Sequence, residues 1–247
     1  MRPALNRVLC ACALTWATTG AYAIDFGSAI SAAADLGKAA TLSEADVKSY
    51  ARQVREYQDA REKMVPASSK YGQRLATLTG KFQTYDGLSL NFKAYQKNEV
   101  NANATADGSV RVYTGLMDLL TDDELLFVIG HEIGHVKFGH SAKEMRSALT
   151  VSGARKAAAA SGNSTVSTLA ASELGGLAEA VLNAQYSQSQ ETESDDYGLT
   201  FLKKNKIKTD GAASSLRKLA KLGGGRHSML SSHPEPSARA ERIAQAN

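Results

Sequence analysis

His131, Glu132 and His135 form the pattern HExxH, in which the residue types and their spacing suit metal binding and the activation of water. Residues four apart on a helix lie about one turn apart on the same face, so both imidazoles can reach one ion. Glu132 directly follows the first histidine and can take a proton from a metal-bound water instead of binding the metal. The pattern predicts zinc-dependent peptide hydrolysis, with Glu132 as the catalytic residue.

The residues before this motif predict the helix that carries it. Thr121 and Glu124 have the spacing of a capping box, in which each side chain accepts a hydrogen bond from the other residue's backbone N–H. The apolar run from Leu125 to Ile129 then places the motif on a buried helix, where an unpaired histidine would be costly. Two hydrogen-bonded core histidines without a metal are the alternative interpretation.

Two histidines leave a catalytic zinc ion short of a third protein ligand, and residues 185–204 offer one on a partly buried helix. Chemistry favours Glu191 as the ligand and Asp195, on the same face, as the acceptor for the free ring N–H of a ligating histidine. From spacing alone Glu193 or Asp195 also fits as the ligand, and a solvated acidic face is a further alternative. His140 lies one residue short of the third histidine of a metzincin and is interpreted as structural.

The order HExxH then ExxxD resembles the HtpX-like zinc metallopeptidases, a family that also includes the CAAX prenyl endoproteases. Residues 110–118, 128–132 and 218–222 also resemble a bacterial envelope member of that family, and the resemblance runs from Leu42 to the C-terminus. It implies one zinc ion per chain, with Glu191 as the third ligand beside the two histidines.

The resemblance also implies a role for His233 and Arg239, which lie in an HPxxxxR segment. In this family the segment lies close to the metal, so His233 and Arg239 are candidates for a gate or for stabilising the transition state. In the simpler interpretation, Pro234 and Pro236 start a helix over 237–246 and Arg239 pairs with a carboxylate.

The expected fold class is α+β, mainly helical, of the zincin type, with a small antiparallel sheet beside the HExxH helix. Alternation predicts strands at 88–92 and 110–113, with a turn at Asp107-Gly108. Helical spacing predicts helices at 43–64, 71–78 and 210–222.

A strand edge beside the metal helix would pair with an extended substrate and place its carbonyl over the metal. The resemblance points to Asn101, Ala102, Asn103 and Ala104 as part of this edge, and an ordinary hairpin strand is the alternative.

Residues 1–23 read as a secretory signal peptide. Arg2 and Arg7 precede an apolar segment, and Ala21-Tyr22-Ala23 is a cleavage signal, so we expect export to the periplasm. Cys12 lies in a partial lipobox, which makes an outer-membrane lipoprotein the less favoured alternative. Residues 24–42 are expected to form a loosely attached arm and 43–247 a single metallopeptidase domain, in which the Ala-, Ser- and Gly-rich stretch 147–182 contains either a lid or a spacer.

Composition limits the classes of binding partner that we expect. Cleavage would remove both cysteines, so no disulfide would remain, and it would leave basic and acidic residues nearly balanced. Nucleic acid binding is not expected, and no other apolar run approaches the roughly 18 residues of a membrane span. The expected partners are unfolded or envelope polypeptides, with possible peripheral association with an outer-membrane complex.

The sequence therefore predicts a periplasmic zinc endopeptidase that degrades misfolded or envelope proteins. The competing class is a chaperone or outer-membrane assembly factor in which His233 keeps the same site latent. A purely structural zinc site with four protein ligands is a third interpretation, which HExxH disfavours because a closed site needs no base.

Overall fold

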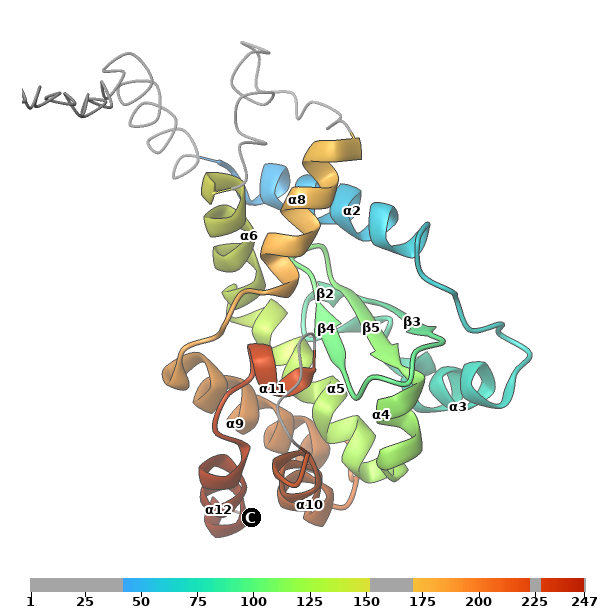
Figure 1. The fold of residues 1–247 in the computed structure, drawn as a ribbon. Coiled ribbons are helices and arrows are strands. Elements are labelled where there is room, and N and C mark those ends of the chain that lie inside the picture. The colour runs from blue at the N-terminus through green and yellow to red at the C-terminus, as the bar shows by residue number, and fades with distance from the viewer. Residues whose placement is uncertain (1–41, 152–170, 223–227, 247) are drawn as a thin grey trace, which may run out of the picture.

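The computed structural model describes residues 42–151, 171–222 and 228–246, in which helices surround a small sheet (Figure 1). The signal peptide, nearly all of the predicted arm and residues 152–170 lie outside this part of the chain. The described helices are α2 (Glu44–Asp59), α3 (Lys70–Thr79), the 3₁₀ turn η1 (Gly80–Phe82), α4 (Thr114–Leu119), α5 (Asp122–Lys137), α6 (His140–Val151), α8 (Ala171–Leu182), α9 (Gln188–Lys204), α10 (Asp210–Ala220), α11 (Met229–Ser232) and α12 (Pro236–Ala246). The strands are β1 (Thr84–Tyr85), β2 (Leu88–Ser89), β3 (Asn91–Tyr95), β4 (Ala102–Ala104) and β5 (Ser109–Tyr113).

Local signals set the starts of the helices that carry the candidate residues. Thr121 and Glu124 form the predicted capping box at the start of α5, with the Thr121 backbone N–H 2.8 Å from a Glu124 carboxylate oxygen. Ser187 and Gln190 form a second box at the start of α9. These boxes satisfy backbone donors that a helix start would otherwise leave unpaired.

The prediction of a helix over 43–64 is wrong at its C-terminal end, because α2 stops at Asp59. Residues beyond it take an extended course along β3: the Gln96 N–H donates to the Lys63 carbonyl, and the Val65 N–H donates to the Ala94 carbonyl. Tertiary pairing therefore overrides helical spacing here.

The α+β class and the small sheet beside α5 are confirmed, but the prediction of an antiparallel sheet is wrong in one pairing. The strand order is β3-β5-β4, with β4 antiparallel and β3 parallel to β5. The chain reverses direction between β3 and β4 and again between β4 and β5. Because β5 lies between the other two strands, it is antiparallel to β4 and parallel to β3. The strand predicted at 88–92 divides into β2 and the start of β3. The Asp107-Gly108 turn is present, with Gly108 at a φ of 87° that favours glycine.

Two apolar clusters hold the elements together. The larger joins the sheet to α3, α4, α5, α9, α10 and α12, and the smaller joins α2 to α6 and α8 on the other side of the sheet (Figure 1). Within the described ranges, no helix is both long and apolar enough to cross a bilayer.

Helices α5 and α9 approach each other unusually closely, and glycines permit this. A Cβ atom at Gly130 would lie 2.9 Å from the Phe201 ring, and one at Gly198 would lie 3.0 Å from the Phe127 ring and 3.2 Å from the His131 backbone nitrogen. Real Cβ atoms essentially never come as near as 2.9 Å, and 3.0–3.2 Å is tight, so a larger residue at either position would force the facing ring or backbone to shift. This contact brings the acidic residues of α9 against the HExxH motif.

Asp59, at the end of α2, anchors that helix to the sheet. Its carboxylate accepts two hydrogen bonds of 2.8 Å from the buried Arg111 guanidinium and one of 2.6 Å from the Tyr95 hydroxyl. Burial would raise the pKa of Asp59, but the hydrogen bonds from Arg111 and Tyr95 outweigh burial and lower this pKa.

Replacing Asp59 with asparagine is expected to lower the free energy of unfolding by about 2 kcal/mol at pH 7. A carboxyl group whose pKa is lower in the folded chain stabilises the fold above its unfolded pKa of about 3.9. This contribution fades as the pH falls through the folded-state pKa, so the difference between variant and wild type should shrink below about pH 4. Urea unfolding between pH 3 and 7 measures it, with the exposed Asp118→Asn as the control. An equal difference at every pH would contradict the assignment.

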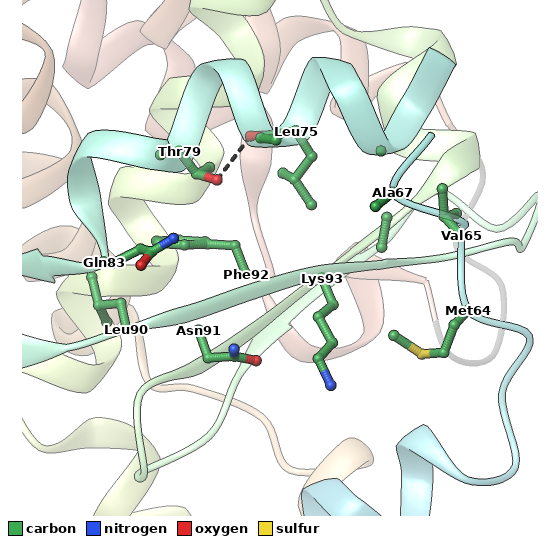
Figure 2. A pocket seen from close by; sticks show the side chains of 14 residues that line it. Met64, Val65, Ala67, Leu75, Thr79, Gln83, Leu90, Asn91, Phe92 and Lys93 are labelled. Carbon is green, nitrogen blue, oxygen red and sulfur yellow. Dashed lines mark hydrogen bonds between the residues drawn. The ribbon is translucent and has the colours of Figure 1, made fainter. Parts of the chain in front are cut away.

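A cavity of about 450 Å³ lies between α3 and the outer edge of β3, lined by residues that include Leu75, Thr79, Phe92 and Lys93 (Figure 2). The strand β4 forms the opposite edge of this sheet. None of the titratable residues singled out by the sequence lines this cavity.

Candidate metal centre

Three parts of the chain, far apart in sequence, meet at one buried cluster. Helix α5 contributes His131, Glu132 and His135, and α9 contributes Glu191. His233 follows α11 directly as its C-terminal cap. All five side chains are buried.

Ligand atoms of His131, His135, Glu191 and His233 lie within 4.8 Å of one another. The Nε2 atoms of His131 and His135 are 2.9 Å apart, and His135 Nε2 lies 3.3 Å from Glu191 Oε1. His233 Nδ1 lies 2.9 Å from the same Glu191 oxygen and 3.2 Å from His131 Nε2. The two histidines of HExxH therefore face one point together with Glu191, and His233 Nδ1 lies beside the same point.

Asp195 contacts the His131 ring on the side that faces away from the cluster. Its Oδ1 lies 3.0 Å from His131 Nδ1, the ring nitrogen that points away from the cluster. Arg239 on α12 donates to both oxygens of Asp195, at 2.7 and 2.8 Å, and also contacts Glu191. Arg239 thus lies in the site by pairing with carboxylates, as in the simpler of the two interpretations of its segment.

The second histidine of the motif has neighbours that sequence reasoning did not assign to the site. Tyr186 stacks on the His135 ring at 3.7 Å between centroids. His140 places its Nδ1 3.2 Å from His135 Nδ1, and its Nε2 lies 3.0 Å from Glu193. This contact could have been predicted from the spacing, because His140 lies five residues after His135 and directly follows Gly139, at which the helix would be expected to end.

The charges in the cluster follow from burial and neighbours. Burial would raise the pKa of Glu191, but His233 and His131 hold this pKa well below its usual range. Burial also opposes charge on Asp195, and the hydrogen bond from Arg239 holds its pKa below the usual value. Burial lowers the pKa of His135 well below its usual value, so this ring is neutral at pH 7. Metal binding requires such neutral imidazoles and ionised carboxylates.

Glu132 differs from the other carboxylates because neither of its buried oxygens has a hydrogen-bond partner among the described residues. It lines a cleft of about 30 Å³ together with His233, Asn101, Asn103 and Ala104. The strand β4, which contains three of the four predicted edge residues, pairs on one side with β5 and with no described strand on the other. An ionisable group close to it is His233, whose Nε2 lies 3.5 Å from Glu132 Oε1. The cleft therefore places a carboxylate without a hydrogen bond beside a strand edge that pairs with no described strand.

The donor set fits a zinc ion. If His131 donates its Nδ1 proton to Asp195, its Nε2 lone pair points into the cluster towards His135 Nε2. Two lone pairs cannot form a hydrogen bond with each other, whereas a cation between them binds both. Imidazole nitrogen and carboxylate oxygen are ligands that zinc accepts in catalytic sites.

Two helical histidines and a glutamate from a second helix, beside a strand edge and a glutamate without a hydrogen bond, define a zincin-type metallopeptidase. Comparison of sequences gives the family: the profile of peptidase family M48 matches residues 71–247, so the chain belongs to that family and is a metalloendopeptidase.

Three relatives support this assignment. The chain is 43% identical to the metalloprotease YcaL of Escherichia coli (strain K12) over 224 residues, covering 90% of this chain and 88% of YcaL. It is 40% identical to the metalloprotease LoiP of the same organism over 241 residues, covering 97% and 95% of the two chains. The mitochondrial metalloendopeptidase OMA1 of Arabidopsis thaliana is 28% identical over 164 residues, which cover 66% of this chain and 32% of OMA1. The predicted relationship to HtpX-like metallopeptidases is confirmed.

Proposed function

We propose that this chain is a periplasmic zinc endopeptidase that degrades misfolded or envelope proteins. The observation that supports this most is the meeting of His131, His135 and Glu191 beside Glu132, whose oxygens accept no hydrogen bond from the described residues, and the edge of β4 that pairs with no described strand. Membership of a metallopeptidase family supplies the reaction class, and polypeptides are its substrates.

In this proposal His131, His135 and Glu191 hold one zinc ion. Zinc bound there would act as a Lewis acid that makes water more acidic and polarises the scissile carbonyl. Asp195 holds the proton on His131 Nδ1, so that Nε2 is free to bind. Arg239 offsets part of the negative charge of Glu191 and Asp195 and fixes their positions.

Glu132 is the general base of the proposal. Its oxygens have no hydrogen-bond partner among the described residues that would hold them back, and they line the cleft where the peptide must lie. The carboxylate takes the proton of the attacking water and then delivers it to the leaving amine.

The strand β4 aligns the substrate in this proposal. Asn103 on β4 accepts a hydrogen bond of 2.7 Å from the buried Arg55 of α2, which braces the strand from behind. Backbone groups on the open edge would pair with an extended peptide in any sequence context, which suits a protease of unfolded chains.

The proposal that the chain is exported rests on its sequence alone. The basic start, apolar segment and Ala21-Tyr22-Ala23 signal support removal of residues 1–23 and release into the periplasm. Peripheral association with an outer-membrane complex is part of the same proposal. Mass spectrometry of the mature N-terminus separates a chain cleaved after Ala23 from one carrying lipid on Cys12.

A second candidate function is a latent envelope chaperone or assembly factor, and one observation favours it. His233 shares the cluster with the other candidate ligands, and the cleft volume of about 30 Å³ equals roughly that of one water molecule. Val181, Leu182, Tyr186 and His233 also line this cleft. In this candidate function the lining would have to move before a peptide enters, and His233 would act as the gate.

Removing the metal is expected to stop proteolysis, and one equivalent of zinc per chain is expected to restore it. The assay follows cleavage of casein by the purified protein, with and without a chelator and with His233→Ala alongside wild type. Zinc-dependent cleavage by wild type supports the protease. Zinc binding without cleavage by wild type, together with cleavage by His233→Ala, supports the latent factor instead. Cleavage that persists at full rate in the zinc-free protein would contradict both.

A further inference from the structure

The far side of His135 is occupied by a second imidazole. His135 Nδ1 points away from the candidate metal ligands and lies 3.2 Å from His140 Nδ1. The other nitrogen of His140, Nε2, lies 3.0 Å from a Glu193 carboxylate oxygen. His140 is buried, whereas the Glu193 side chain is 58% exposed, so the chain of contacts runs from the cluster to solvent.

Only one placement of protons satisfies these contacts when His135 binds a metal. Binding through Nε2 requires the lone pair there, so the proton of the neutral ring sits on Nδ1. This N–H must donate to His140 Nδ1, which therefore has no proton. His140 then carries its proton on Nε2 and donates it to Glu193. The reverse orientation would put the proton of His135 on Nε2 and block the metal.

We propose that His140 is a positioning residue that, with Glu193, fixes His135 in the tautomer that binds the metal. The inference rests on the proposed metal site and assigns two further residues to it. Ser194 Oγ, 3.4 Å from His140 Nδ1, lies close enough to limit rotation of the ring.

The local structure explains how His140 reaches this place. Helix α5 ends at Lys137, and Gly139, at a φ of 73°, turns the chain so that α6 begins at His140. Residues of other types are disfavoured at this backbone angle. The turn folds His140 back against the last turn of the helix that carries His135.

Helix α9 then supports both histidines of the motif by different routes. Asp195 accepts directly from His131, whereas Glu193 acts on His135 through the ring of His140. Glu191, Glu193 and Asp195 therefore have separate roles: the first is a candidate ligand, and the other two support one histidine each. His131 is held by an anion and His135 by a neutral ring.

Two variants of His140 test this positioning role. In His140→Asn the amide oxygen can occupy the place of Nδ1 and still accept from His135, whereas His140→Leu keeps the volume and removes the acceptor. Zinc affinity, measured by competition with a chelating dye, is expected to fall about 10- to 100-fold in His140→Leu. His140→Asn is expected to stay close to wild type. Met145→Ala, which loosens the packing of α6 in the smaller apolar cluster, is the control for a purely structural effect.

Nitrogen-15 NMR of the histidine rings reads the tautomer directly in the zinc-bound protein. A proton on His140 Nε2 and none on Nδ1 supports the inference, and a proton on Nδ1 overturns it. Wild-type affinity in His140→Leu, with tight zinc binding by wild type, overturns the role of His140 and leaves the proposed function standing. Loss of affinity in His140→Asn equal to that in His140→Leu, or in Met145→Ala, also overturns it. If wild type binds no zinc, both proposals fail.

Discussion

Replacing Glu132 with glutamine is expected to slow cleavage of an unfolded protein by about 100- to 10,000-fold, the usual contribution of a general base. Glutamine keeps the size and shape of the side chain but cannot accept a proton from water. Glu132 makes no hydrogen bond to the described residues and is not among the four candidate ligands, so zinc content should not change. Burying an amide in place of a carboxylate that accepts no hydrogen bond should also leave the fold intact, because it removes a buried charge.

The measurement combines the casein cleavage rate with zinc content and thermal unfolding of the same preparations. Glu179→Gln, the same change on the exposed face of α8, is the matched control and should retain wild-type activity. Cleavage by Glu132→Gln at the wild-type rate would show that another group accepts the proton. Loss of zinc from this variant would instead make Glu132 a ligand.

The second large effect is expected for Arg239→Met, a change at a residue that is not a metal ligand. Arg239 pairs with Asp195 through two hydrogen bonds and contacts Glu191, and all three side chains are buried. Removing the cation leaves two buried anions without it, and breaking a buried ion pair on one side costs about 3–5 kcal/mol. Methionine fills much of the volume, so the loss reports charge more than packing.

Urea unfolding in the presence of a chelator measures this loss, because bound zinc would itself offset the charge of Glu191. Zinc added in excess should recover part of the lost stability. Arg242→Met is the control, since Arg242 is more exposed and pairs mainly with the exposed Asp196, an ion pair worth about 1 kcal/mol or less. Equal losses of unfolding free energy in the two variants would contradict the expectation that the buried Arg239 contributes more to stability than Arg242.

Much of the site follows from spacing along single helices. The four-residue separation of His131 and His135, and that of Glu191 and Asp195, fixes each pair on one helix face wherever the helix lies. The capping box at Thr121 and Glu124 likewise sets the start of α5 from local hydrogen bonds.

Contacts between elements were predictable only in part. The family resemblance placed Glu191 and His233 near the metal, and the structure brings them into one cluster with the two histidines. No local pattern indicated that Glu193 would reach His140, because that contact crosses from α9 to α6. The same limit explains the sheet: alternation located the strands, but β5 lies between β3 and β4 because its residues are all buried and Arg111 pairs with Asp59.

The sequence by itself therefore indicated the candidate residues for the chemistry and determined how those on the same helix are oriented, because hydrogen bonds and side-chain directions within a helix are local. Apart from Asp195, which chemistry already favoured as a support, only the tertiary structure decided which residues support them. Those partners depend on the close approach of α5 and α9 at Gly130 and Gly198, on the turn at Gly139, and on the docking of α12 that brings Arg239 to Asp195. Packing of the whole core sets these contacts, and packing is not written in any one segment of the chain.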